Sequence, residues 1–216
     1  MKKQWIDDSY DKRKRGLLTW LRKGGHIRAL AVVPMATDAT AWSEEDYRRY
    51  VKSLGNPDAT IATKALFSRS RNGNPGSYFG GLGGIQGNVD LFLDPDSGLT
   101  KHCPGNRWQN WNENAHVAVS EVIELVRADV HRLVLVYDHT VPRSADADSA
   151  KASANARVTA FQNANAPAVA WFWERAREMD PLVIIGVSSS ADRVSRIRLA
   201  TGTLGASGVG SGWSSL

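Results

Sequence analysis

The chain is poor in several features that would otherwise define its class. It holds one cysteine, Cys103, in 216 residues, which excludes an internal disulfide and a zinc finger built from cysteines. No apolar run approaches the roughly 20 residues needed to cross a bilayer. The short run 16–21 lacks the small-residue cleavage site of a secretory signal. We therefore expect a cytoplasmic protein with no transmembrane segment.

Charge of one sign is only slightly in excess. The 27 lysines and arginines outnumber the 22 acids, for a net charge of +5 and a pI near 9.5. Such an excess favours an anionic partner, and nucleic acid is the commonest one for a small basic protein. The hydrophobic share of 42% and the charged share of 23% are ordinary for a folded protein. The composition thus predicts a globular protein with nucleic acid as its expected partner.

Apolar patterning predicts strands that alternate with helices. The expected strands are 26–34, 89–93, 99–102, 131–139, 181–187 and 196–201. The expected helices are 10–23, 43–54, 114–126 and 144–179, with Pro167 breaking or kinking the last. The turn-forming residues 94–98 suggest that the second and third strands form a hairpin.

This order of elements predicts an α/β fold with a mixed, mainly buried sheet flanked by helices. A chain of this length can bury one core, so we expect a single domain over 1–216. Residues 1–25 would form a basic N-terminal helix or arm. Residues 202–216, rich in glycine and serine, would form a flexible tail. No internal repeat is found.

Two local patterns allow a ligand-binding interpretation and a plainer one. The glycines between 73 and 87 lack the spacing of a dinucleotide or phosphate loop, which leaves a mobile loop or a substrate lid. Asp90, Asp94 and Asp96 could hold a hard cation, but the segment that contains the last two is also a good turn sequence. The turn is the better interpretation because no further acid completes a calcium loop.

An aromatic, asparagine-rich stretch precedes the helix expected from about 114. Its Trp108 and Trp111 could stack on bases while nearby cations meet phosphates, or could cover the edge of the core. Burial is the commoner use of tryptophan. A catalytic pair of Cys103 with a histidine is weaker still, because nothing in the sequence indicates an activated thiolate.

The sharpest feature is a buried strand that ends in Asp138 and His139. Open α/β proteins place their sites at the carboxyl ends of strands, and an acid next to an imidazole can bind metal or transfer protons. At this point the sequence, Leu133-Val134-Leu135-Val136-Tyr137-Asp138-His139-Thr140-Val141-Pro142, resembles the HNH or ββα-metal nucleases. Asn155 and Asn163 follow at spacings similar to the later positions of that motif.

The resemblance implies a role for each of these residues. His139 would be the general base that deprotonates water, and Asp138 with Asn163 would bind one divalent cation, Mg²⁺ or Mn²⁺, against the scissile phosphate. Asn155 would hold the loop. Two departures count against it: residues 145–153 lack the alternation of a second hairpin strand, which favours a parallel crossover, and the bracing cysteine pairs are missing. A different site at the same place, or a capped loop with no site, stays open.

The working hypothesis is a metal-dependent nucleic-acid phosphodiesterase. Its phosphate and base contacts would come from Arg13, Lys14, Arg15, Arg69, Arg71, Arg143, Trp108 and Trp111. One alternative is a nucleotide- or nucleoside-directed hydrolase or transferase with the glycine loop closing over its substrate. The other is a non-enzymatic nucleic-acid-binding or assembly protein of a virus or mobile element.

Overall fold

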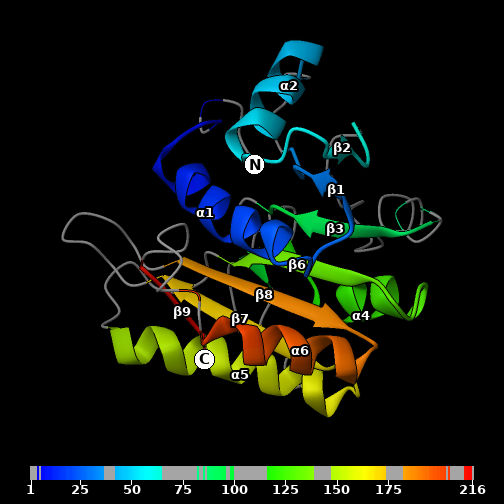
Figure 1. Cartoon of the computed structure of the whole chain (residues 1–216), viewed down its shortest axis with the longest axis vertical. Helices are drawn as coiled ribbons and strands as arrows, with labels where there is room; N and C mark the ends of the chain where they lie inside the picture. Colours follow the sequence, from blue (N-terminus) through cyan, green and yellow to red (C-terminus); the bar gives the residue numbers. More distant parts are fainter. Residues whose placement is uncertain are drawn as a thin grey trace, which may run out of the picture.

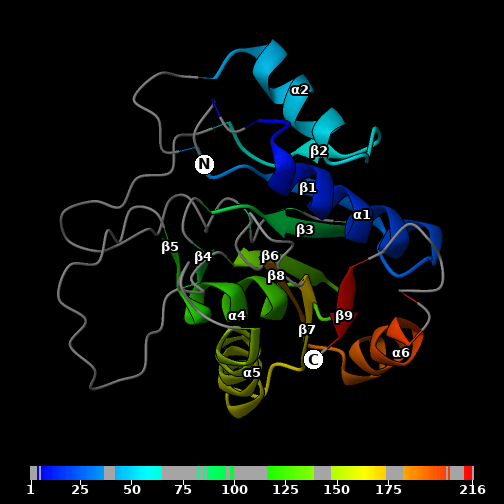
Figure 2. The same cartoon turned by 90° about the vertical axis from the view of Figure 1, so that its left-hand side faces the viewer.

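A mixed sheet of seven strands runs through the middle of the computed structural model (Figures 1 and 2). The structure describes residues 6–36, 42–64, 87–95, 98–99, 116–138, 147–173, 182–202 and 212–215, with the single residues 4, 82, 85 and 204. In spatial order the strands are β2 (Thr60–Ile61), β1 (Ala29–Val33), β3 (Val89–Leu93), β6 (Leu133–Asp138), β8 (Leu182–Ser188), β7 (Ala168–Trp173) and β9 (Trp213–Ser215). The predicted α/β class is confirmed.

The first four strands of this order are parallel, and the others alternate. β1 pairs in parallel with both β2 and β3, and β3 pairs in parallel with β6. β8 is antiparallel to β6 and β7, and β9 is antiparallel to β7. β2 lies on one side of β1 and β3 on the other. The chain therefore reverses its winding direction across the sheet between β1 and β3. In open α/β sheets, ligands bind at the carboxyl ends of the strands beside such a reversal.

Helices cover both faces of the sheet. α1 (Ser9–Lys23), α2 (Glu44–Ser53) and α6 (Ala191–Thr201) pack on one face, and α4 (Val119–Arg127) and α5 (Ala147–Asn163) pack on the other. The strands supply alternate side chains to the two layers, as the two-residue period of a strand requires. In β6, Leu133, Leu135 and Tyr137 face α1, while Val134 and Val136 face α4 and α5.

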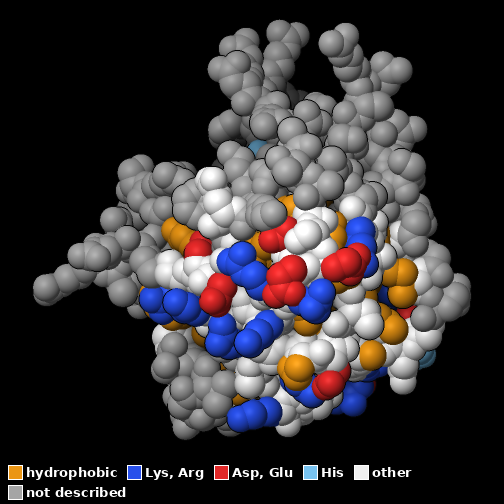
Figure 3. Space-filling model, turned by 90° about the horizontal axis from the view of Figure 1, so that it is seen from above, with side chains coloured by type: hydrophobic (Ala, Val, Ile, Leu, Met, Phe, Trp, Pro, Cys, Tyr) orange, Lys and Arg blue, Asp and Glu red, His pale blue; other side chains and the backbone are white. Residues whose placement is uncertain are grey.

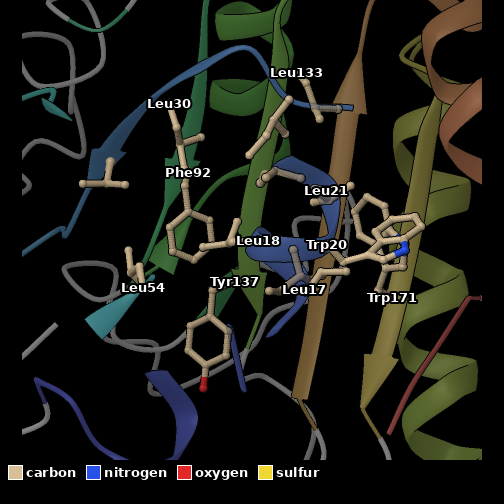
Figure 4. Close-up of a cluster of buried hydrophobic side chains, with 14 of the residues drawn as sticks. Leu17, Leu18, Trp20, Leu21, Leu30, Leu54, Phe92, Leu133, Tyr137 and Trp171 are labelled. Atoms are coloured by element: carbon tan, nitrogen blue, oxygen red, sulfur yellow. The ribbon is translucent and has the colours of Figure 1, made fainter. Parts of the chain in front are cut away.

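The N-terminal helix belongs to this core and is not an arm. Its side chains Leu17, Leu18 and Leu21 are fully buried, and Figure 4 shows them against side chains of the sheet such as Phe92. Asp8 caps the helix by accepting hydrogen bonds from the amides of residues 10 and 11. Burial of three leucines contributes several kcal/mol, at about 1.5–3 kcal/mol for each side chain.

Two expected elements have the opposite secondary structure. Residues 168–173 were predicted to continue a helix beyond Pro167, but they form β7, whose six residues are all buried. A continuous apolar run of this length fits a strand covered on both faces. Residues 196–201 were predicted as a strand but belong to α6, because Val194, Ile197 and Thr201 bury one face at helical spacing.

The expected hairpin after β3 and the expected flexible tail both differ from the structure. Residues 98–99 form β4, but this strand pairs in parallel with β5 (His116–Val117) and not in a hairpin with β3. The expected flexible tail includes β9, which pairs with the edge of β7. Trp213 of β9 is buried and donates a hydrogen bond from its indole nitrogen to the carbonyl oxygen of Arg13. β9 therefore ties the end of the chain to α1 and the sheet.

Gly212 is required for β9 to reach its place, and its replacement by alanine should be destabilising. Its φ of +92° is one that side chains disfavour, and a Cβ atom there would lie 2.2 Å from Nε1 of Trp173. We expect Gly212→Ala to lower the free energy of unfolding by about 1–3 kcal/mol, as overpacking and backbone strain usually do. Urea denaturation measures this loss. Gly202→Ala is the control, because a Cβ atom there meets nothing closer than 3.7 Å; an equal loss in both variants would contradict the interpretation.

Candidate functional site

The carboxyl ends of β1, β3 and β6 lie along one edge of the sheet, beside the reversal of winding. Each of these ends carries an unusual residue. Met35, two residues after β1, has a left-handed backbone with φ of +46°, which is uncommon for a residue other than glycine. Asp94 directly follows β3, and Asp138 is the last residue of β6. Both acids are buried, with exposed fractions of 1% and 0%.

Asp94 is the centre of a buried polar cluster on the α1 face of the sheet. The ammonium group of Lys14 on α1 lies 2.9 Å from each of its carboxylate oxygens. The hydroxyl of Tyr50 on α2 donates to Oδ2 of the same carboxylate at 2.9 Å. The backbone amide of Asp94 donates to the carbonyl oxygen of Val33, the last residue of β1. The carboxylate of Asp94 thus joins α1 and α2 to the end of β3, and its backbone amide adds a bond to β1.

A second carboxylate extends the cluster along α1. Asp11 lies one helical turn before Lys14 and accepts from its ammonium group at 3.1 Å. Its other oxygen accepts from the hydroxyl of Ser53 at 3.1 Å. The Lys14 ammonium group also lies 4.1 Å from the ring centre of Tyr137 on β6, within the range of a cation–π interaction. The site so defined, which we call the Lys14 cluster, comprises Asp11, Lys14, Tyr50, Ser53, Asp94 and Tyr137.

The Lys14 cluster buries two carboxylates with a single ammonium group. Burial raises the pKa of Asp94, and the nearby Lys14 only partly opposes that change. Burial by itself would lower the pKa of Lys14, but the carboxylates of Asp94 and Asp11 outweigh it and raise that pKa above its ordinary value. Burial also raises the pKa of Tyr137 well above its usual range, and Asp94 adds to this. At neutral pH Lys14 is therefore charged and Tyr137 keeps its proton.

Asp138 is held on the opposite face of the sheet. Its Oδ2 forms an ion pair with Nε of Arg157 on α5 at 2.6 Å, and its Oδ1 accepts from the backbone amide of Leu99 at 3.1 Å. Arg157 is itself buried and also donates to the hydroxyl of Ser153 at 2.9 Å. The side chain of Asp138 thus joins β6 to α5 and β4. The adjacent His139 lies outside the described residues.

The structure does not bring together Asp138, Asn155 and Asn163, the described residues among those that the nuclease resemblance implies. The chain continues from β6 through α5 to β7, which is parallel to β6 because both are antiparallel to β8. Asp138 is at the carboxyl end of β6, whereas Asn163 ends α5 close to the amino end of β7 (Figure 1). Asn155 lies between these ends and is exposed. Asp138 and Asn163 are therefore at opposite ends of the crossover and do not share a cation.

The three cations expected to grip phosphates from α1 are engaged within the protein. Lys14 is buried in its cluster, which makes its predicted phosphate contact wrong. The guanidinium carbon of Arg13 lies 3.3 Å from the ring centre of Trp173. Arg15 donates from Nε to the carbonyl oxygen of Ser53 at 2.7 Å. The other predicted contacts, Arg69, Arg71, Arg143, Trp108 and Trp111, lie outside the described residues.

Asp90 sits at the other end of β3 and organises the amino edge of the sheet. Its carboxylate accepts hydrogen bonds from the side chains of Arg28 and Arg193 and from the backbone amides of Arg28 and Leu133. Asp90 and Asp94 are thus separated by the length of β3 and cannot share a cation. Asp96 lies outside the described residues. Within the described ranges, no group of three histidine, cysteine or acidic side chains could hold a metal ion.

The Asp138–Arg157 pair allows a direct test of its contribution to stability. Asp138→Asn keeps an acceptor for the guanidinium group but removes the negative charge that balances a buried arginine. We expect a loss of about 2–4 kcal/mol, somewhat below the 3–5 kcal/mol typical of breaking a buried pair outright. Chemical denaturation at pH 7 measures this loss. The control is Asn155→Ala, a substitution at an exposed position of α5, the helix that carries Arg157. A loss below about 0.5 kcal/mol, the usual size for a surface substitution, would show that the pair does not stabilise the fold.

Comparison of the chain with family models, with curated proteins and with solved structures found no match. Among the described helices, none combines the length and the apolar composition needed to cross a bilayer.

Proposed function

We propose that this protein is a nucleotide- or nucleoside-directed hydrolase or transferase whose site lies at the carboxyl edge of β1, β3 and β6. The observation that carries the proposal is the reversal of winding between β1 and β3, with the buried carboxylate of Asp94 directly beyond it. Doubly wound sheets bind nucleotides in the crevice at this position. The net charge of +5 suits a phosphorylated ligand.

The state of the three α1 cations that were predicted to bind phosphates favours a small ligand over a polymer, although Lys12, Arg22 and Lys23 of the same helix are exposed. A protein that grips a nucleic-acid backbone presents several lysines and arginines to solvent along one face. Of the three cations expected to do this, Lys14 is fully buried and Arg13 and Arg15 are each held by other parts of the protein. A site at the strand ends needs only one or two ligand-facing groups and the backbone around them.

In this proposal the Lys14 cluster positions the site and does not itself react. Asp94 is nearly inaccessible, so its carboxylate would fix the path of the chain from β3 into Pro95. Tyr50 and Lys14 hold that carboxylate in one orientation through three hydrogen bonds. Met35 lies on the other side of the reversal, and its left-handed backbone fits the strain that is often found at functional sites.

The test is a panel of nucleosides and their 5′-mono- and triphosphates, offered to the full chain with Mg²⁺ or with EDTA. Thermal shift and calorimetry report binding, and chromatography reports turnover. We expect at least one compound to bind and to be converted. Tyr50→Phe should weaken that binding, because it removes one of the three hydrogen bonds that fix the Asp94 carboxylate at the strand end. It should also lower the free energy of unfolding by about 1.5–3 kcal/mol, the usual worth of a hydrogen bond to a charged group.

The matched control is Ser189→Ala, which removes a hydroxyl hydrogen bond to the carbonyl oxygen of Val126 away from the proposed edge. It should leave binding unchanged. Failure of every compound to bind would overturn the proposal. Cleavage of plasmid DNA that EDTA abolishes, without turnover of free nucleotides, would replace it with a metal-dependent nuclease. Salt-dependent binding of nucleic acid without any turnover would replace it with a non-enzymatic binding protein.

A further inference from the structure

A groove at the far edge of the sheet is separate from the site proposed above. It lies between α2 and the edge strand β2, at the end of the molecule where both are drawn in Figures 1 and 2. Its volume is about 810 Å³, which is within the range of about 300–1,000 Å³ that ligand sites occupy. Val51 and Tyr47 of α2 line one side, and Ala59 and Ile61 of the β2 segment line the other.

Among the described residues, no strand pairs with the outer backbone edge of β2. β2 is the last strand of the sheet on this side and pairs only with β1 among the described strands. The amide of Ala62 donates to the carbonyl oxygen of Val32 on β1. Because backbone groups of neighbouring residues in a strand point to opposite sides, the amide and carbonyl groups of Ile61 point away from β1. They are positioned to pair with an added strand.

The rim of the groove is mainly basic. Arg48, Lys52 and Lys64 line it together with one acid, Glu44. Two of these cations form exposed ion pairs, Lys64 with Glu44 and Arg48 with Glu45, and exposed pairs contribute little stability, about 0–1 kcal/mol. Carboxylates of a partner could therefore replace them at little cost. Figure 3, seen from the end that carries α2, shows basic and acidic side chains intermixed on this face.

We propose that this groove binds an extended acidic peptide of another protein, which adds as a strand to the free edge of β2. A strand added at about 4.8 Å from β2 would pair with the backbone of Ile61. Its side chains would alternate in direction, and the set that faces α2 would place apolar residues against Val51 and Ile61 and acidic residues against Arg48 and Lys52. The helix on one side and the open strand on the other favour a peptide over a nucleic acid, which has no use for the backbone edge.

The test is selection of peptides from a random twelve-residue display library on the full-length protein. We expect the selected peptides to carry apolar and acidic residues two positions apart, on the same face of the added strand, and synthetic copies to bind in solution by fluorescence anisotropy. Methylation of alternate backbone nitrogens should abolish binding, because it removes the donors that pair with β2. Lys52→Glu should weaken binding at least tenfold. Ile61→Pro should do the same, since it removes the outward-facing amide at an edge position that tolerates proline.

Arg49→Glu is the matched control, because it makes the same change of charge on the same exposed helix without lining the groove. Its affinity should stay within twofold of the unaltered protein. The proposal is overturned if the library yields no binding peptide, if the selected peptides lack acidic residues, or if the Lys52→Glu and Arg49→Glu variants bind equally. It is also overturned if a single-stranded oligonucleotide competes for the groove and loses binding in Lys52→Glu. Nucleotide binding at the carboxyl edge of β1, β3 and β6 should be unaffected by these variants.

Discussion

Replacement of Lys14 by methionine should lower the free energy of unfolding by about 3–5 kcal/mol, the usual cost of removing one partner from a buried ion pair. Methionine keeps the apolar stem of the side chain but removes the ammonium group, including its contact with the ring of Tyr137. It leaves Asp94 and Asp11 buried without the ammonium group that both contact within 3.1 Å. The loss is therefore electrostatic and not a cavity effect.

Urea denaturation at pH 7 measures this change, and Lys12→Met is its control. Lys12 is exposed on the same helix, so its replacement should alter stability by no more than about 0.5 kcal/mol. Equal effects of the two substitutions would show that the Lys14 ammonium group does not hold the fold together.

The pH dependence of the Lys14→Met variant follows from the raised pKa of Asp94. A carboxyl group whose pKa is higher in the folded than in the unfolded protein binds its proton more tightly when folded, so stability falls as pH rises between the two values. In the unaltered protein Lys14 opposes this rise in pKa. Removal of Lys14 should raise the pKa of Asp94 further, so that stability falls over a wider range of pH. The variant should therefore approach the stability of the unaltered protein near pH 4 and diverge from it toward pH 7.

Replacement of Asp90 by asparagine should have a comparable effect at the other edge of the sheet. The carboxylate is fully buried and accepts hydrogen bonds from two guanidinium groups. One belongs to Arg28, which directly precedes β1, and the other to Arg193 on α6. Asparagine would direct an NH₂ group at one of them and remove the charge that balances both. We expect a loss of about 3–5 kcal/mol.

The control for this variant is Asp192→Asn on α6. Its carboxylate pairs with Arg196, but both side chains are at least 70% exposed, so the change should cost less than about 1 kcal/mol. Thermal unfolding of both variants compares the two positions. A similar small shift in each would mean that Asp90 does not organise the amino edge.

Several strands of the sheet could be predicted because their sequences are short apolar runs. The runs at 133–137 and 182–187 contain no charged residue and are almost wholly apolar, and such runs are typical of strands buried on both faces. The start of α2 could be predicted from Ser43 and Asp46. The side chain of each accepts a hydrogen bond from the backbone amide of the other. The helix α6 was missed because its apolar residues are sparse and arginines fill the positions between them.

The Lys14 cluster was missed for a different reason. Lys14 was assigned to the solvated side of its helix by residue type, although it lies three residues before Leu17 and seven before Leu21, on the buried stripe. Asp11 lies on the same stripe. Spacing was therefore a usable signal for their burial. The partner of Lys14, Asp94, is 80 residues further along the chain, and no local pattern identifies a contact over that separation.

A nucleotide site at the carboxyl edge of β1, β3 and β6 is tested most directly by hydrogen–deuterium exchange. The full chain is compared with and without the nucleotide that gives the largest thermal shift. A ligand at the carboxyl edge should protect peptides that contain Pro34–Ala36 and Asp94–Leu99. It should leave peptides around Asp129–Arg132 and Ser188–Ser190, at the amino edge, unchanged. Protection confined to the amino edge, or no protection in any peptide, would contradict the placement of the site.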